Sequence, residues 1–292
     1  MFNLNRTCLI ASGYLYKFDD YPAFNPKNWA GVLTKGLSLE ERKGNPAHRL
    51  AETECGVINS IGLANPGAKS FCSNVLPGLQ SLDIPVIANL SGWSIEGYGE
   101  LASKLVEFSK DSYWAYEVNL SCPNVHGGSL EFGTDIDVIK SVIKSVRKET
   151  KKPIIAKLTP LVPDMRPYAE AALEAGSDAI TVANTYPAMA IDIEKRIPVL
   201  GTEYGGLSGP AITPITLRHC HMIYREFKCD ILASGGIMDI NSALSYIMSG
   251  AKWLQIGALF FSNPKKAVDF PLELDEEIKK RGGMKNILGA AV

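Results

Sequence analysis

Short apolar runs alternate with amphipathic stretches along most of the chain. From residue 84 onward the runs are separated by segments with helical periodicity, such as 95–109, 135–150 and 164–175. Parallel strands joined by helices have this rhythm. With two earlier runs, the predicted strands are 7–11, 30–35, 84–90, 113–120, 153–158, 178–183, 230–233 and 252–256. Eight such strands predict an α/β fold, a (β/α)8 TIM barrel.

Two long insertions and several helix-end signals complete the predicted organisation. Asp164 is expected to cap a helix that ends at Gly176. Segments 36–60 and 185–209 interrupt the rhythm, and loops of that length inside a compact domain are usually functional. We therefore predict one domain, residues 1–292, whose barrel carries inserted loops or short strands over its carboxyl-terminal face.

Composition narrows the class of partner. The chain has 30 Lys and Arg against 31 Asp and Glu, so no basic excess favours nucleic acid, and a small molecule is the expected partner. No apolar run approaches the roughly 18 residues that span a bilayer, and the run at 8–11 is too short for a signal peptide. We predict a cytoplasmic protein. The six cysteines form no Cys-x-x-Cys pair, which argues against a disulfide framework or a metal site in this chain.

One motif carries the first candidate for catalysis. Cys122 lies in Asn119-Leu-Ser-Cys-Pro-Asn124, just past an apolar run, where a thiol flanked by carboxamides suits proton abstraction beside a hydrogen-bonded planar ligand. The alternative is a buried cysteine that packs as a small hydrophobic residue. The histidines at 48, 126, 219 and 221 are expected on the surface or in loops, and only His126 is near enough in sequence to tune the thiol.

Polar residues and glycines gather where the predicted strands end. Chemistry in a β/α barrel lies at the carboxyl ends of the strands, and six polar residues end or follow strands there: Ser12, Lys35, Asn89, Asn119, Lys157 and Asn184. Glycine clusters at 205–209, 234–236 and 257–258 predict a phosphate site, although each could merely shape a turn. Lys35 and Lys157 at strand ends would need negative charge nearby, unless they extend to solvent.

A set of short motifs spans nearly the whole chain: Ala11-Ser-Gly13, Leu33-Thr-Lys-Gly36, Gly44-Asn-Pro46, Asn59-Ser-Ile-Gly-Leu63, Asn119-Leu-Ser-Cys-Pro-Asn124, His126-Gly-Gly128, Phe132-Gly-Thr-Asp135, Gly206-Leu-Ser-Gly-Pro210 and Gly235-Gly236. In these motifs the chain resembles the class 1 dihydroorotate dehydrogenases, which are FMN-dependent β/α barrels. It is most similar to the NAD-linked class 1B catalytic subunit.

The resemblance implies a role for each matching residue. Cys122 would take a proton from C5 of dihydroorotate while hydride leaves C6 for the flavin, and Lys157 would offset charge on the reduced flavin. Substrate would be bound by Lys35, Asn59, Ser60, Ile61, Gly62, Leu63, Asn119, Asn184 and Thr185. FMN would be bound by Ser12, Lys35, Gly36, Asn89, Asn119, Lys157, Ala183, Gly209, Gly235, Gly236, Gly257 and Ala258. The family also implies a homodimer and a partner subunit with FAD and a [2Fe–2S] cluster.

Two segments depart from the family pattern near the expected pyrimidine pocket. Tyr14-Leu-Tyr16 replaces the usual Thr-Phe-Gly, and Tyr186-Pro-Ala-Met189 replaces a small, glycine-containing turn. The alternatives are therefore a flavin oxidoreductase of another dihydropyrimidine or cyclic amide, or a class 1A enzyme that uses fumarate. A flavin-binding scaffold without catalysis is disfavoured by the intact motif. A phosphate-sugar barrel without flavin would need carboxylates at strand ends, where none is expected.

Overall fold

Eight parallel strands close into a barrel in the computed structural model, which describes residues 4–14, 25–121 and 133–292. The strand order is β1-β14-β13-β8-β7-β6-β5-β2, and β2 returns to pair with β1. Their bounds are β1 (Cys8–Ile10), β2 (Gly31–Leu33), β5 (Val86–Leu90), β6 (Ala115–Asn119), β7 (Ile154–Lys157), β8 (Ala179–Val182), β13 (Ile231–Ser234) and β14 (Trp253–Ile256). Each coincides with one predicted strand, which confirms the predicted (β/α)8 barrel.

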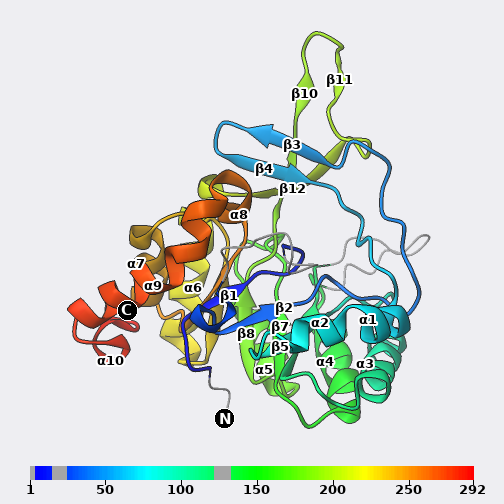
Figure 1. Cartoon of the computed structure of the whole chain (residues 1–292), viewed down its shortest axis with the longest axis horizontal. Helices are drawn as coiled ribbons and strands as arrows, with labels where there is room; N and C mark the ends of the chain where they lie inside the picture. Colours follow the sequence, from blue (N-terminus) through cyan, green and yellow to red (C-terminus); the bar gives the residue numbers. More distant parts are fainter. Residues whose placement is uncertain (1–3, 15–24, 122–132) are drawn as a thin grey trace.

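Helices surround the barrel (Figure 1). Their bounds are η2 (Pro26–Asn28), α1 (Ala68–Asn74), α2 (Leu76–Gln80), α3 (Ile95–Ser109), α4 (Ile136–Glu149), α5 (Arg166–Glu174), η3 (Pro210–Ile212), α6 (Thr213–Phe227), α7 (Ile240–Met248), α8 (Ala258–Ser262), α9 (Pro264–Lys280) and α10 (Met284–Ile287). Helix α5 begins at Arg166, two residues later than predicted, because Asp164 lies outside the helix and accepts the Arg166 backbone N–H at 3.0 Å. Within the described part of the chain, no helix is both long and apolar enough to cross a bilayer.

One histidine does not lie where the sequence suggested. His219 sits on the buried face of α6 with only 3% of its surface exposed, beside Cys220 and one turn from Thr216 and Ile223. These positions recur at helical spacing, so the helix turns His219 toward the barrel. Burial lowers the pKa of His219, and the neighbouring Arg218 lowers it further. The surface expectation for this histidine is therefore wrong.

The barrel interior changes from apolar to polar along the strands. Side chains alternate between the two faces of a strand, so Ala115, Glu117 and Asn119 of β6 share one face. The residues at the amino-terminal level form one apolar cluster: Leu4, Leu9, Ala30, Leu33, Ile87, Ala115, Ile155, Ala179, Leu232 and Trp253. Two residues further along the strands, the same face carries Asn89, Glu117, Lys157, Thr181 and Gln255. The fold therefore places a polar layer directly beneath the carboxyl-terminal mouth.

The two long insertions meet as a separate sheet over that mouth. Strands β3 (Leu50–Thr53), β4 (Gly56–Asn59), β12 (Tyr204–Ser208) and β9 (Tyr186–Met189) pair in this antiparallel order. A hairpin of β10 (Ile191–Asp192) and β11 (Ile197–Pro198) projects beyond the sheet, at the end of the molecule opposite the amino terminus (Figure 1). The predicted insertion of short strands over the carboxyl-terminal face is confirmed.

Candidate active site at the barrel mouth

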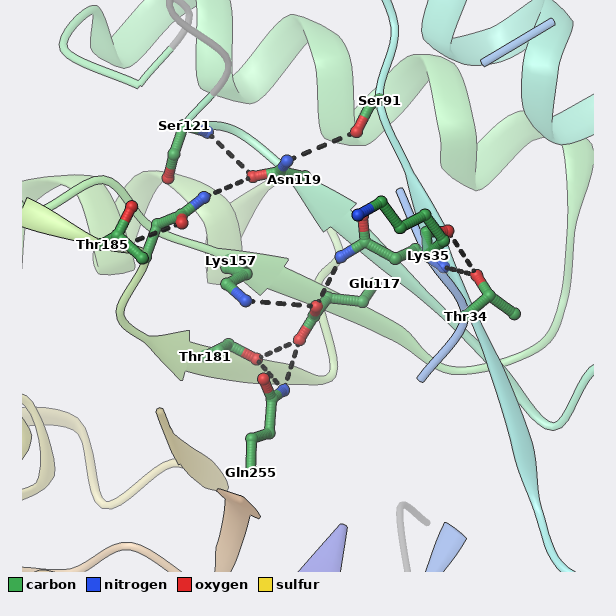
Figure 2. A network of polar contacts seen from close by, with 12 residues as sticks. Thr34, Lys35, Ser91, Glu117, Asn119, Ser121, Lys157, Thr181, Thr185 and Gln255 are labelled. Carbon is green, nitrogen blue, oxygen red and sulfur yellow. Dashed lines mark hydrogen bonds and ion pairs between the residues drawn. The ribbon is translucent and has the colours of Figure 1, made fainter. Parts of the chain in front are cut away.

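Asn119 lies at the centre of a polar network at the mouth (Figure 2). Its side-chain Nδ2 donates to Ser91 Oγ at 3.3 Å, and its Oδ1 accepts from Asn184 Nδ2 at 3.0 Å and from the Ser121 backbone N–H at 3.4 Å. The Tyr98 hydroxyl donates to the Asn119 carbonyl at 2.6 Å. These contacts fix the orientation of the Asn119 carboxamide and bring two of the three predicted ligand-binding asparagines together.

Asn59, the third asparagine, approaches from the inserted sheet. Its Nδ2 donates to the Gly206 carbonyl on β12 at 3.1 Å. A methyl group at Gly206 would come within 1.9 Å of Thr185 Oγ1, so only glycine lets β12 pass this close to Thr185. The Thr185 backbone N–H in turn donates to Asn184 Oδ1 at 2.8 Å. Asn59 therefore joins the other two asparagines through Gly206 and Thr185.

The turn at residues 60–63 approaches Gly36, three residues after the end of β2, through the Leu63 side chain. A methyl group at Gly36 would lie 3.0 Å from Leu63 Cδ2 and 3.2 Å from Asn89 Oδ1. Gly62 and Leu63 have φ of 71° and 56°, a left-handed turn that turns the chain beside Gly36. Ser60 is 8% exposed, and its Oγ makes no hydrogen bond with any other described residue. A buried hydroxyl of this kind is available to a ligand.

The loops after β13 and β14 form the predicted glycine cradle. Gly236 has φ of 67°, and a methyl group there would lie 2.1 Å from Thr213 Oγ1 and 2.6 Å from the Gly209 carbonyl. Within the described chain, the backbone N–H groups of Gly235, Gly236 and Ala258 donate no hydrogen bond. Free N–H groups around glycines suit an anion such as phosphate.

Ala183 and three further glycines of the predicted clusters have distinct positions. Ala183, the first residue after β8, donates its backbone N–H to the Ser234 carbonyl at 3.0 Å and so lies beside the cradle. A methyl group at Gly257 would meet the Tyr14 ring at 2.7 Å. Gly205 and Gly206, in contrast, belong to β12 of the inserted sheet. Their predicted place in a phosphate loop is wrong, because the chain uses them where strands approach closely.

Two lysines bring positive charge to the mouth. Lys157 is 7% exposed, and its ammonium group makes no hydrogen bond within the described residues; its Nζ lies 3.8 Å from Glu117 Oε1. Burial lowers the pKa of Lys35, and the nearby Arg49 lowers it further. A cavity of about 380 Å³ opens beside Lys35 and is lined by Gly13, Lys35, Glu41, Ala64, Asn65 and Pro66. An anionic ligand at the mouth would compensate the Lys35 ammonium, which has no ion pair among the described residues, whereas Lys157 is already paired with Glu117.

A buried carboxylate that was not among the predicted site residues lies beneath the two lysines. Glu117 is fully buried and accepts hydrogen bonds from Asn89 Nδ2 at 2.7 Å, Thr181 Oγ1 at 2.7 Å and Gln255 Nε2 at 2.5 Å. Glu117 lies in the middle of β6, one layer below the strand ends at which no acid–base carboxylate was expected. The sequence feature that could have indicated Glu117 is a charged residue two positions before Asn119 in an otherwise apolar strand. This spacing puts both side chains on one face of the strand.

Cys122 and His126 lie outside the described residues, and so does Tyr16. The described parts of the two departures from the family pattern both contact the mouth. Tyr14 packs against Gly257 and the rings of Phe260 and Phe261, and burial raises its pKa to about 12. Tyr186 begins β9, and its hydroxyl lies 3.4 Å from Thr216 Oγ1.

The fold and the site define a (β/α)8-barrel protein whose mouth combines carboxamides, buried lysines and a glycine cradle. A family model described as dihydroorotate dehydrogenase matches residues 2–278, and the chain belongs to this family. It is 41% identical over 280 residues to the protein of Geotalea daltonii named dihydroorotate dehydrogenase B (NAD(+)), catalytic subunit, covering 95% of this chain and 90% of the relative.

Other relatives with the same name cover almost the whole chain. That of Desulforudis audaxviator is 38% identical over 291 residues, which are 99% of this chain and 94% of the relative. That of Caldicellulosiruptor bescii is 41% identical over 264 residues, which are 90% of this chain and 87% of the relative. The predicted resemblance to class 1B catalytic subunits is confirmed.

Proposed function

We propose that this chain is the catalytic subunit of a dihydroorotate dehydrogenase, an oxidoreductase of CH–CH groups that converts (S)-dihydroorotate to orotate in pyrimidine biosynthesis. The observation that carries the proposal is the convergence of Asn119, Asn184 and Lys157 at the mouth of a barrel from this family. Neighbouring carboxamides offer both donors and acceptors to a planar pyrimidine, and a buried ammonium offers charge compensation.

The residues at the mouth fit FMN as cofactor. The free N–H groups of the glycine cradle suit its single phosphate, and the buried Lys157 ammonium suits a ring that becomes anionic on reduction. When bound, FMN would accept the hydride that leaves the substrate. The proposed cofactor-binding residues are Ser12, Lys35, Gly36, Asn89, Asn119, Lys157, Ala183, Gly209, Gly235, Gly236, Gly257 and Ala258.

Substrate would lie between the asparagines and the turn at residues 60–63. Asn119 and Asn184 orient each other, and the pocket would be closed by Asn59 from β4 of the inserted sheet and by Thr185, the residue before β9. The proposed substrate-binding residues are Lys35, Asn59, Ser60, Ile61, Gly62, Leu63, Asn119, Asn184 and Thr185. The thiolate of Cys122 would act as the base and take the proton from C5 of the ring.

A second subunit would complete the electron path. The relatives are named catalytic subunits of an NAD(+) enzyme, and the described residues contain no group of three or more His, Cys, Asp or Glu side chains that could hold a metal ion. We propose that a second subunit with FAD and a [2Fe–2S] cluster accepts electrons from this chain and passes them to NAD. We also propose that this chain is a cytoplasmic homodimer. A class 1A enzyme, in contrast, would be reoxidised by fumarate without that subunit.

The test is a spectrum followed by a titration. The purified chain should be yellow, release FMN and not FAD on denaturation, and be bleached by dihydroorotate under anaerobic conditions. Tyr186 at the pocket favours one alternative, a related ring as substrate, which titration with orotate, uracil and other cyclic amides would detect. A colourless chain that cannot be reconstituted with FMN would refute the proposed function.

A further inference from the structure

We propose that Glu117 is a positioning residue that orients Asn89 and Lys157 from beneath the mouth and sets the electrostatic potential there. The negative charge of Glu117 partly cancels the positive charge of the two lysines. Bound FMN is therefore harder to reduce than it would be at the same site without the Glu117 charge. The inference rests on the proposed FMN site. It concerns a carboxylate below the residues to which cofactor binding is assigned.

The contacts of Glu117 are those of an ionised carboxylate. Oε2 accepts from Thr181 Oγ1 and from Gln255 Nε2, and Oε1 accepts from Asn89 Nδ2. Gln255 Nε2 also donates to Thr181 Oγ1 at 3.2 Å, so the hydroxyl hydrogen of Thr181 remains for Glu117. Every partner therefore donates, and none accepts a proton from Glu117. These hydrogen bonds satisfy the Glu117 carboxylate and fix its orientation at the centre of the barrel, whereas the buried Gln255 Oε1 accepts no hydrogen bond from the described residues.

This arrangement determines which atom Asn89 presents to the mouth. Its Nδ2 is bound to Glu117, so its Oδ1 points the other way and lies 3.2 Å from the position of a methyl group at Gly36. The Asn89 backbone N–H is separately held by Thr34 Oγ1 at 3.0 Å. Asn89 is therefore presented as a hydrogen-bond acceptor beside Gly36. Rotation of its amide would place two N–H donors there and an oxygen against the Glu117 carboxylate.

Lys157 is held by charge and not by a hydrogen bond. Its Nζ is 3.8 Å from Glu117 Oε1, too far for a hydrogen bond but close for an ion pair in a buried place. Among the described residues, no acceptor takes any of the three ammonium hydrogens, which are therefore available to a ligand above Lys157. Glu117 also offsets the positive charge of Lys157, so a ligand meets a nearly neutral pair. Without Glu117, Lys157 would carry a full charge and lose its buried partner.

This charge balance predicts the direction of a change in reduction potential. Reduced FMN is more negative than oxidised FMN, so a nearby carboxylate disfavours the reduced form. Two unit charges about 8 Å apart at an effective dielectric constant of about 20 change an equilibrium constant more than tenfold. Glu117→Gln should therefore increase the affinity for reduced FMN relative to that for oxidised FMN by at least about tenfold. For a two-electron couple this shifts the midpoint potential by about +30 mV.

The experiment measures that potential on the full chain loaded with FMN, by spectrophotometric titration against a reference dye. Gln255→Met is the matched control, because it removes a hydrogen bond from the same carboxylate but leaves the charge in place. The expected result is a positive shift for Glu117→Gln and less than a third of that shift for Gln255→Met. No shift in Glu117→Gln, or an equal shift in both variants, would overturn the inference.

A second set of variants tests the inference if Glu117→Gln alone folds poorly. Lys157→Met leaves Glu117 unpaired and should lower the potential, and adding Glu117→Gln to it should restore part of the loss. A double variant with the potential of Lys157→Met alone would also overturn the inference. Chemical unfolding of the FMN-free chain should show that Glu117→Gln destabilises the parent more than it destabilises the Lys157→Met background. This last measurement needs no flavin, so it separates failure of the ion pair from failure of the proposed cofactor.

Discussion

The bond between Asn184 and Asn119 predicts that the two residues act as one unit in ligand binding. Asn184→Ala removes the donor to Asn119 Oδ1, a 3.0 Å hydrogen bond to a residue that is 8% exposed. A buried group left without its partner costs about 1–3 kcal/mol, so orotate affinity should fall by about 5- to 150-fold. Asn119→Ala should cost a similar amount, because it removes the other half of the same pair.

The two losses should not add. Residues in direct contact show coupling energies of about 0.5–3 kcal/mol in double-mutant cycles, whereas independent sites add within about 0.5 kcal/mol. Orotate would be titrated into the oxidised FMN-loaded protein and its dissociation constant read from the flavin spectrum. The control cycle pairs Asn184→Ala with Asn74→Ala, since Asn74 is exposed on α1 and bonds only Ser70 among described side chains. Additivity in both cycles would refute the argument that the 3.0 Å contact organises the pocket.

Three further outcomes are expected. Cys122→Ala should slow flavin reduction by dihydroorotate about 100-fold or more and retain FMN, and the parent rate should rise with pH toward the ordinary thiol pKa of about 8.5; an unchanged rate would place the base elsewhere. Gly236→Ala should lower FMN affinity at least about tenfold, measured by fluorescence, because its methyl group would meet Thr213 Oγ1 at 2.1 Å. Gly283→Ala is the control, because Gly283 also has a positive φ, 90°, but a methyl group there would meet no heavy atom within 4 Å. This variant carries the same kind of backbone strain and should leave FMN affinity unchanged. Because the pKa of His219 is lowered in the folded chain, the unfolded chain takes up a proton below about pH 6.5 that the folded chain does not. The free energy of unfolding should therefore fall on acidification. In urea titrations at several pH values, His219→Gln should make the free energy of unfolding depend less steeply on pH.

The sequence by itself determined the barrel and the parts of the chain that carry its chemistry. Eight apolar runs separated by amphipathic segments specify parallel strands and crossovers, because both periodicities follow from local backbone geometry. The rule that parallel strands end at one face then placed Asn119, Lys157 and Asn184 in the same mouth. The motif around Asn119 was specific enough to indicate the family that the comparisons confirmed.

Only the tertiary structure decided how these residues contact one another. Gly205 and Gly206 read as a phosphate loop, but pairing between insertions more than 140 residues apart places Gly206 opposite Asn59 in one sheet. The sequence shows Glu117 only as one charged residue within an apolar strand. Its hydrogen-bond partners Asn89, Thr181 and Gln255 come from three other strands. Which residues face each other depends on strand register and barrel closure, and these are set by contacts between distant segments that no local pattern contains.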